Sequence, residues 1–242
     1  MYKYFYDLHI HSCLSPCGDD DMTPNNIVNM SGLKALDIIA VCDHNSIKNC
    51  EAVFKAAKNN DTGLLVIPAS EITTSEEIHT LVYFSGFEGM YDFESEVLYK
   101  KRVMIKNNKK IFGEQIIMDE FDNITGEDEY LLINAADISI DEIFKTAGRY
   151  EAAAVPAHID KDANGLLAIF AYFPEHLRNN PVEIKDFEKI DGLRSEHMLT
   201  GRILCSSDAH YLWDIAEPGN VLHSEREILT AADFINLILQ KY

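Results

Sequence analysis

Histidines and carboxylates recur in this sequence just after short apolar segments. His9 and His11 follow the apolar segment at residues 2–8, and Asp208 and His210 follow another one near the end of the chain. Residues i and i+2 of a strand point to the same side, so each pair can face one ion. Similar residues follow the apolar segments between these pairs, at Asp43-His44, Glu71, His79 and His158. Imidazoles and carboxylates on separate strand ends favour a multinuclear site for divalent metal ions.

Apolar segments alternate with helical patterns along the chain, which predicts a parallel sheet or barrel. Strands are expected at residues 2–8, 35–42, 63–69, 80–84, 152–157, 190–194 and 202–207. Helices are expected from Pro24 onward and at residues 50–59, 88–107, 139–150 and 231–241. Thr23 before Pro24, and Ser139 three residues before Glu142, are typical of helix N-termini.

The bulk properties fit one domain, residues 1–242, in which 47% of residues are hydrophobic. Residues 108–128 are the least regular stretch, and we expect an excursion from the barrel over about residues 88–128. No apolar run reaches the roughly 18 residues of a membrane span, and the N-terminus lacks the shape of a signal peptide. We therefore expect a cytoplasmic protein with no membrane partner.

The formal net charge is −19. A strongly acidic surface repels long nucleic acids, whose binding depends on basic side chains that neutralise phosphates. We therefore expect a small phosphorylated substrate and no long nucleic acid. The sequence does not set the oligomeric state.

The five cysteines are expected to be reduced thiols, because an odd count does not indicate a disulfide framework. Cys13 and Cys17 lie close to His9 and His11. Structural zinc sites usually need four soft ligands, and the sequence has no second pair of this kind, so we expect no metal role for these two thiols. Three further histidines match no pattern and are expected at the surface: His176, His197 and His223.

Five segments resemble, in order, the motifs of the PHP (polymerase and histidinol phosphatase) metal-dependent phosphoesterases. They are Asp7-Leu8-His9-Ile10-His11-Ser12, Val41-Cys42-Asp43-His44-Asn45, Ala69-Ser70-Glu71-Ile72, Pro156-Ala157-His158 and Ser207-Asp208-Ala209-His210. The resemblance extends nearly end to end and is weakest over residues 88–128. It implies a distorted (β/α)7 barrel, similar to a TIM barrel, with a di- or trinuclear site at the C-terminal face of the strands.

The resemblance further implies the ligands of two or three divalent ions, for which a mixed set of imidazoles and carboxylates suits Mn²⁺, Fe²⁺ or Zn²⁺. The first ion would be held by His9, His11, Glu71 and Asp208. The second would be held by Glu71, His79 and His158. The third would be held by His44, His210 and an aspartate. Counting back from Pro24 places that aspartate at Asp19, with Asp20 as the alternative.

Other residues are expected to act on the substrate. His210 or His158 could protonate the leaving alkoxide. Asp43 would orient a ligand or the catalytic water. Lys161 and Arg194 could bind phosphate oxygens, or be ordinary surface cations.

These residues indicate a phosphoesterase that hydrolyses a small phosphate monoester or a short nucleotide through a metal-activated water. Clustered divalent ions lower the pKa of a bound water towards about 7 and neutralise the phosphoryl charge. One alternative is an exonuclease-type PHP module that trims 3′ or 5′ ends. Another is a non-catalytic metal-binding accessory protein. Metal-dependent amide hydrolysis usually needs a bridging lysine, and no lysine stands at a comparable strand end.

Overall fold

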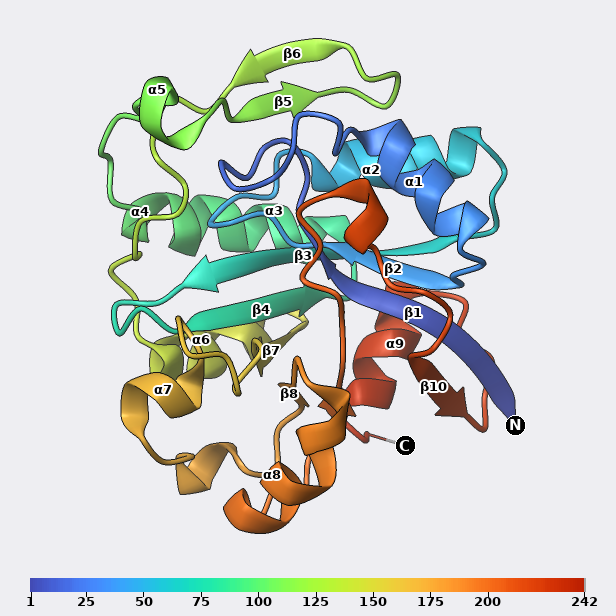
Figure 1. Ribbon diagram of the computed structural model, residues 1–242, viewed down its shortest axis with the longest axis vertical. Helices are drawn as coiled ribbons and strands as arrows, with labels where there is room; N and C mark the ends of the chain where they lie inside the picture. Colours follow the sequence, from blue (N-terminus) through green and yellow to red (C-terminus); the bar gives the residue numbers. More distant parts are fainter. Residues whose placement is uncertain (242) are drawn as a thin grey trace.

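A computed structural model, which describes residues 1–241, has a curled six-stranded sheet at its centre (Figure 1). The strand order is β10-β1-β2-β3-β4-β7. The strands are β1 (Tyr2–Ile10), β2 (Ile38–Val41), β3 (Leu65–Thr73), β4 (His79–Phe84), β7 (Ala152–Pro156) and β10 (Val221–Ser224). Strands β1, β2 and β3 are parallel, whereas β4 is antiparallel to both β3 and β7, and β10 is antiparallel to β1.

Two smaller sheets accompany the central one. A hairpin of β5 (Ile116–Met118) and β6 (Ile124–Glu127) lies at the top of Figure 1. Strands β8 (Val182–Glu183) and β9 (Ile203–Leu204) form a parallel pair. The described residues thus form an α/β fold with a half-barrel sheet, and the distorted (β/α)7 barrel expected from the sequence is not seen as one closed sheet.

Helices cover both faces of the central sheet. They are α1 (Pro24–Leu33), α2 (Cys50–Asn59), α3 (Phe87–Phe93), α4 (Tyr99–Lys101), α5 (Lys109–Phe112), α6 (Ile140–Ala147), α7 (Leu166–Phe170), α8 (Ile190–His197) and α9 (Ala231–Ile238). Single turns of other helix types lie at Glu94–Leu98, Gly148–Tyr150, Glu175–Leu177, Phe187–Lys189 and Leu212–Asp214. None of the helices among residues 1–241 is both long and apolar enough to cross a membrane.

The expected helix starts are confirmed. The Thr23 side chain accepts a hydrogen bond from the Asn26 amide, and Pro24 begins α1. Ser139 and Glu142 form a capping box at the start of α6. These contacts satisfy amide groups that have no partner inside the helix.

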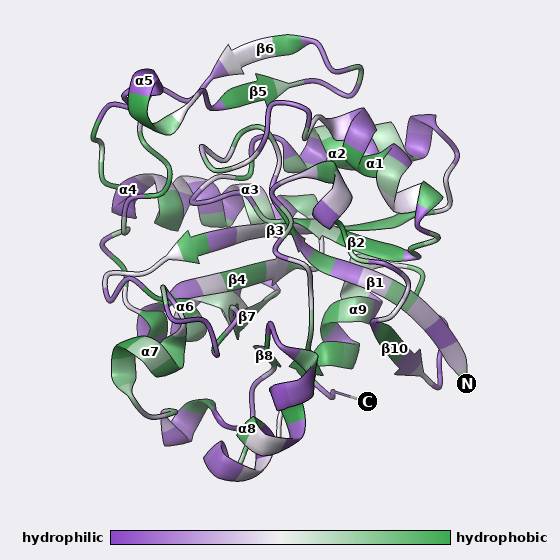
Figure 2. Cartoon of the chain, in the orientation of Figure 1, coloured by the Kyte–Doolittle hydropathy of each residue, from purple (hydrophilic) through white to green (hydrophobic). Residues whose placement is uncertain are grey.

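Alternate residues of the strands bury their side chains on opposite faces. On one face, Leu8, Ala40 and Ile67 belong to a core that includes Phe234 of α9. On the other face, Ile39 belongs to a core with residues of α1 and α2. Figure 2 shows hydrophobic colouring along β2 and hydrophilic stretches in α8. The ends of the strands are therefore held by packing on both sides.

Several expected elements differ from the structure. Residues 190–194 were expected as a strand and are the start of α8. Ile190 and Leu193 are three residues apart, a spacing that also fits one face of a helix, and both pack on the same hydrophobic cluster. The helix expected at residues 88–107 ends at Lys101 and contains a π turn. Strands β8 and β10 were not predicted.

Candidate metal centre

The Glu71 carboxylate on β3 is fully buried and lies among five histidine rings. Oε1 lies 2.9 Å from His79 Nδ1, 3.3 Å from His9 Nε2 and 3.4 Å from His158 Nε2. Oε2 lies 3.0 Å from His44 Nδ1 and 3.4 Å from His11 Nε2. One carboxylate therefore faces two groups of imidazoles, as a bridging ligand would.

Parallel pairing brings the two ends of the chain together at this point. Ile10 and Ala209 form a parallel bridge, in which the His11 amide donates to the Ala209 carbonyl at 2.9 Å. Asp208 therefore stands beside the end of β1. Its Oδ1 lies 3.4 Å from His9 Nε2 and 3.3 Å from His11 Nε2.

The polar atoms of this cluster fit divalent metal ions. Glu71 Oε1 and Oε2, and the Nε2 atoms of His9, His11 and His158, are buried without a hydrogen-bond partner. Buried polar atoms are normally paired, so this many unpaired ligand atoms indicates bound cations. Three groups of ligand atoms each lie within 4.8 Å of one another: His9, His11 and Glu71; His9, His158 and Asp208; His44, Glu71 and His79. The residues expected to hold the first two ions are therefore brought together.

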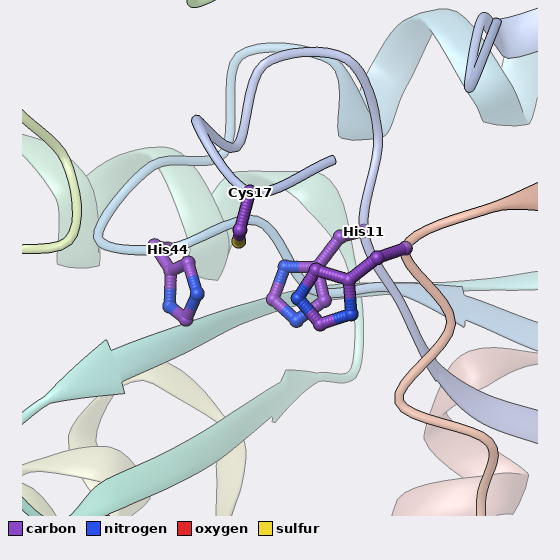
Figure 3. Close-up of side chains that lie close together, drawn as sticks. His11, Cys17 and His44 are labelled. Atoms are coloured by element: carbon purple, nitrogen blue, oxygen red, sulfur yellow. The ribbon is translucent and has the colours of Figure 1, made fainter. Parts of the chain in front are cut away.

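The third expected group is assembled differently. His44 and His210 come together with His11 and with Cys17, and all four ligand atoms lie within 4.8 Å (Figure 3). Asp19 instead accepts a hydrogen bond from the Asp21 amide, and Asp20 is exposed. Among residues 1–241, neither carboxylate belongs to a group of three or more potential ligands. Cys17 is thus the fourth residue of this group, where an aspartate was expected.

The Cys17 thiol is in an electropositive environment. Cys17 is exposed at the surface of the loop. Desolvation of the sulfur by the atoms around it raises the pKa of the thiol, but the neighbouring His44 and His210 outweigh this effect and lower the pKa to about 7. A thiol with this pKa is readily converted to the thiolate, the form that binds metal ions.

Side chains behind the histidines fix the rings. His9 Nδ1 lies 3.0 Å from Glu183 Oε2. The same oxygen accepts a hydrogen bond from the His158 amide at 3.0 Å. A carboxylate on the far nitrogen of a ligand histidine sets its tautomer and orientation. Glu183 was missed by sequence reasoning. The available signal was an acidic residue between Val182 and Ile184 in a buried segment.

Asp43 acts on the loop that follows β1. It accepts hydrogen bonds from the Ser12 amide at 2.8 Å and from the Ser15 hydroxyl at 2.7 Å. Ser15 Oγ in turn lies 3.0 Å from His11 Nδ1. Asp43 therefore positions His11 through Ser15, which is consistent with the expected role in orienting a ligand.

The two cations expected to bind phosphate lie in different places. Lys161 Nζ donates to Asp208 Oδ2 at 2.8 Å, so its ammonium group is at the edge of the cluster. Burial lowers the pKa of Lys161, and Asp208 outweighs this and raises it. Arg194 was expected at a strand end, but it lies within helix α8. Its side chain is exposed.

Comparisons with known proteins point to one fold. No protein-family model matches the chain. The lesion-specific endonuclease PfuEndoQ from Pyrococcus furiosus superposes over 99% of this chain and 56% of its own, with a TM-score of 0.68 and 16% identity. A predicted metal-dependent phosphoesterase from Bifidobacterium adolescentis superposes over 96% of this chain and 95% of its own, with a TM-score of 0.59 and 13% identity. The chain has a PHP-like fold.

Two further matches concern nucleases. Endonuclease Q, solved with a 27-mer duplex that carries an abasic lesion at the active site, superposes over 87% of this chain and 50% of its own, with a TM-score of 0.60 and 17% identity. A 5′-3′ exoribonuclease of Haemophilus influenzae (strain ATCC 51907 / DSM 11121 / KW20 / Rd) is 33% identical over 72 residues, which are 30% of this chain and 24% of that protein. The chain thus spans about half the length of the endonuclease chains and a quarter of the exoribonuclease.

The endonuclease comparison corrects one expectation. We expected the acidic chain to have no long nucleic acid as a partner. This exclusion is wrong, because endonuclease Q, which shares the fold, is solved with a duplex substrate at its active site. Net charge describes the whole surface, whereas substrate contacts depend on the local field around the site, to which bound cations also contribute.

Proposed function

We propose that the chain is a metal-dependent phosphoesterase. The observation that carries this proposal is the buried Glu71 carboxylate, which has no hydrogen-bond partner and is surrounded by ligand atoms from β1, β3, β4 and the loops after β2, β7 and β9. His9, His11, Glu71, His79, His158 and Asp208 would hold two ions, and His44 and His210 would take part in a third. When bound, such ions supply Lewis acidity, which activates water and neutralises phosphoryl charge.

The protein side chains have separate tasks in this proposal. Lys161, held by Asp208, would bind a phosphate oxygen from the edge of the cluster. His210 is partly exposed, and its Nδ1 lies 2.8 Å from the Asp208 carbonyl oxygen, an arrangement that leaves Nε2 as the nitrogen nearer to incoming groups. Whichever of His210 and His158 is not committed to an ion would supply the proton for the leaving alkoxide, and Asp43 would keep the loop of His11 in place.

The substrate that we propose is a small phosphate monoester or a short nucleotide. Support comes from the near-complete match in length to the phosphoesterase from Bifidobacterium adolescentis, which this chain covers over 95%.

Nuclease activity is the second candidate. The 72-residue match to a 5′-3′ exoribonuclease and the fold shared with endonuclease Q favour it. In this case the same metal centre would cleave a phosphodiester at or near a strand end or a lesion.

A substrate panel distinguishes the two candidates. The full chain, loaded with Mn²⁺, Fe²⁺ or Zn²⁺, is incubated with nucleoside monophosphates and bisphosphates, sugar phosphates, a single-stranded oligonucleotide and a duplex with an abasic site. We expect the highest kcat/KM on a small phosphoester. A clear preference for either oligonucleotide would establish the nuclease candidate, and no hydrolysis of any member would refute both.

A further inference from the structure

Cys17 lies in a tightly folded loop between β1 and α1. The Ser15 amide donates to the Ser12 carbonyl at 3.1 Å, and the Gly18 amide donates to the Ser15 carbonyl at 2.8 Å. A Cβ atom on Gly18 would lie 2.3 Å from the Ser12 carbonyl oxygen, so only glycine allows this close approach. The loop turns the Cys17 side chain back towards the histidines, and Sγ lies between His44 and His11 in Figure 3.

The sulfur meets three imidazoles there. The ligand atoms of Cys17, His11, His44 and His210 all lie within 4.8 Å of one another. An independent observation indicates a ligand at this point. His11 is fully buried, and its Nε2 atom has no hydrogen-bond partner. Such atoms are costly to bury unless a cation or a donor meets them.

This group differs chemically from the other three groups of the cluster. Each of the others contains Glu71 or Asp208, whereas this one contains a thiol and imidazoles only. We propose that the Cys17 thiolate, His44 and His210 hold a zinc ion next to His11, so that the centre has one soft position beside harder ones.

Ligand softness gives this position its selectivity. Cysteine sulfur and histidine nitrogen are the common ligands of Zn²⁺, and three protein ligands with one open position are typical of catalytic zinc. Manganese and magnesium prefer oxygen ligands, such as those that Glu71 and Asp208 offer. The chain would therefore bind zinc at the Cys17 position even when another metal occupies the positions around Glu71.

The inference deepens the proposed function, since it rests on the same metal centre, but it does not depend on hydrolysis. Its test is spectroscopic. The full chain is reconstituted with Co²⁺, which replaces zinc and gives sulfur-to-cobalt charge-transfer absorption only when a thiolate is bound. We expect this absorption in the wild type, its loss in Cys17→Ser, and the loss of one equivalent of zinc by elemental analysis of the same variant.

Two variants sharpen the result. Cys13→Ser changes a thiol of the same loop that contacts the Ile116 carbonyl instead of the cluster, and it should keep the absorption and the zinc. Cys17→Asp should bind a full set of Mn²⁺ ions without the absorption, which also shows that the loop still folds. The proposal is overturned if wild-type Co²⁺ protein lacks the absorption, or if Cys17→Ser or Cys17→Asp retains it. If no substrate of the panel is hydrolysed but the absorption is present, the proposed function fails and the metal–sulfur bond is still supported.

Discussion

At the scale of single residues, the sequence reveals most of the expected ligands of the metal centre. It does not reveal the residues that position those ligands. His9, His11 and Glu71 are recognisable because they lie near the ends of buried strands. Glu183 is 174 positions from His9 and belongs to a strand of two residues, so no periodic pattern reveals it. Counting back from Pro24 does not predict how a loop with successive turns orients its side chains, and this loop brings Cys17 close to His44 and His210.

Glu183→Gln tests the support of His9. The amide keeps the shape of the carboxylate but removes the negative charge that faces His9 Nδ1. Metal affinity should fall about 10–100-fold, measured by competition with a chromophoric chelator. Glu188→Gln, at an exposed position, serves as the control. An affinity equal to that of the wild type would show that Glu183 does not position His9.

Asp208→Ala and His9→Ala test the ligands themselves. Each variant should lose at least one equivalent of bound metal and all measurable turnover, because the remaining ligands cannot complete a site. Elemental analysis and circular dichroism report the metal content and the fold. Asp214→Ala, an exposed acid close in sequence, should behave like the wild type. Activity within tenfold of the wild type would argue against both ligand assignments.

At the scale of secondary structure, the short helices and strands are the ones that the sequence does not predict. The order of β1, α1, β2, α2 and β3 could be predicted, since each element is long or periodic enough. Strand β4 was placed correctly along the chain, but its antiparallel direction depends on the short connection after Thr73, which leaves no room for a crossover helix. The hairpin of β5 and β6 was expected only as an irregular excursion.

The base of that hairpin depends on one buried carboxylate. The Asp128 carboxylate accepts hydrogen bonds from Arg102 at 2.9 Å and from Lys48 at 2.8 Å. Asp128→Asn would leave Arg102 nearly buried without its charge partner, so the free energy of unfolding should fall by about 3 kcal/mol. Urea unfolding of the full chain measures this. The neighbouring Glu129→Gln breaks only an exposed ion pair with Lys106 and should change stability by less than about 1 kcal/mol.

The effect of Asp128 should also depend on pH. Burial raises the pKa of this carboxyl, but the hydrogen bonds from Arg102 and Lys48 outweigh burial and lower it. A carboxyl whose pKa is lowered in the folded state stabilises the protein at pH values above its unfolded pKa of about 4. This stabilisation is lost as the pH falls below that value. The difference between the wild type and Asp128→Asn should therefore shrink below about pH 4. A difference that is constant with pH would contradict the ionic explanation.

At the scale of the whole molecule, the metal centre lies where the main elements converge. Its ligands come from both ends of the chain and from three strands of the central sheet, so bound ions would connect these elements to one another. Ligands that bind only the folded state stabilise it by mass action. Stability and metal content should therefore be linked.

Removal of the metal tests this link. A chelator should lower the Tm, and readdition of Zn²⁺ or Mn²⁺ at about 100 times the Kd should recover about 2.7 kcal/mol, or about 5–10 °C for a chain of this size. Scanning calorimetry provides the measurement, with His9→Ala as the variant in which the recovery should be smaller. A Tm that is insensitive to chelator and metal would show that the cluster is stable without ions.

The pairing of Ile10 with Ala209 has a consequence for synthesis on the ribosome. His9 and His11 leave the ribosome early, whereas Asp208 and His210 follow only after about 200 more residues have been translated. Domains generally fold as units once their contacts are available. A nascent chain that is stalled before residue 208 therefore presents His9, His11 and Glu71 without Asp208 and His210. Stable metal capture is thus a late event, and it marks a chain whose translation has passed its last ligand.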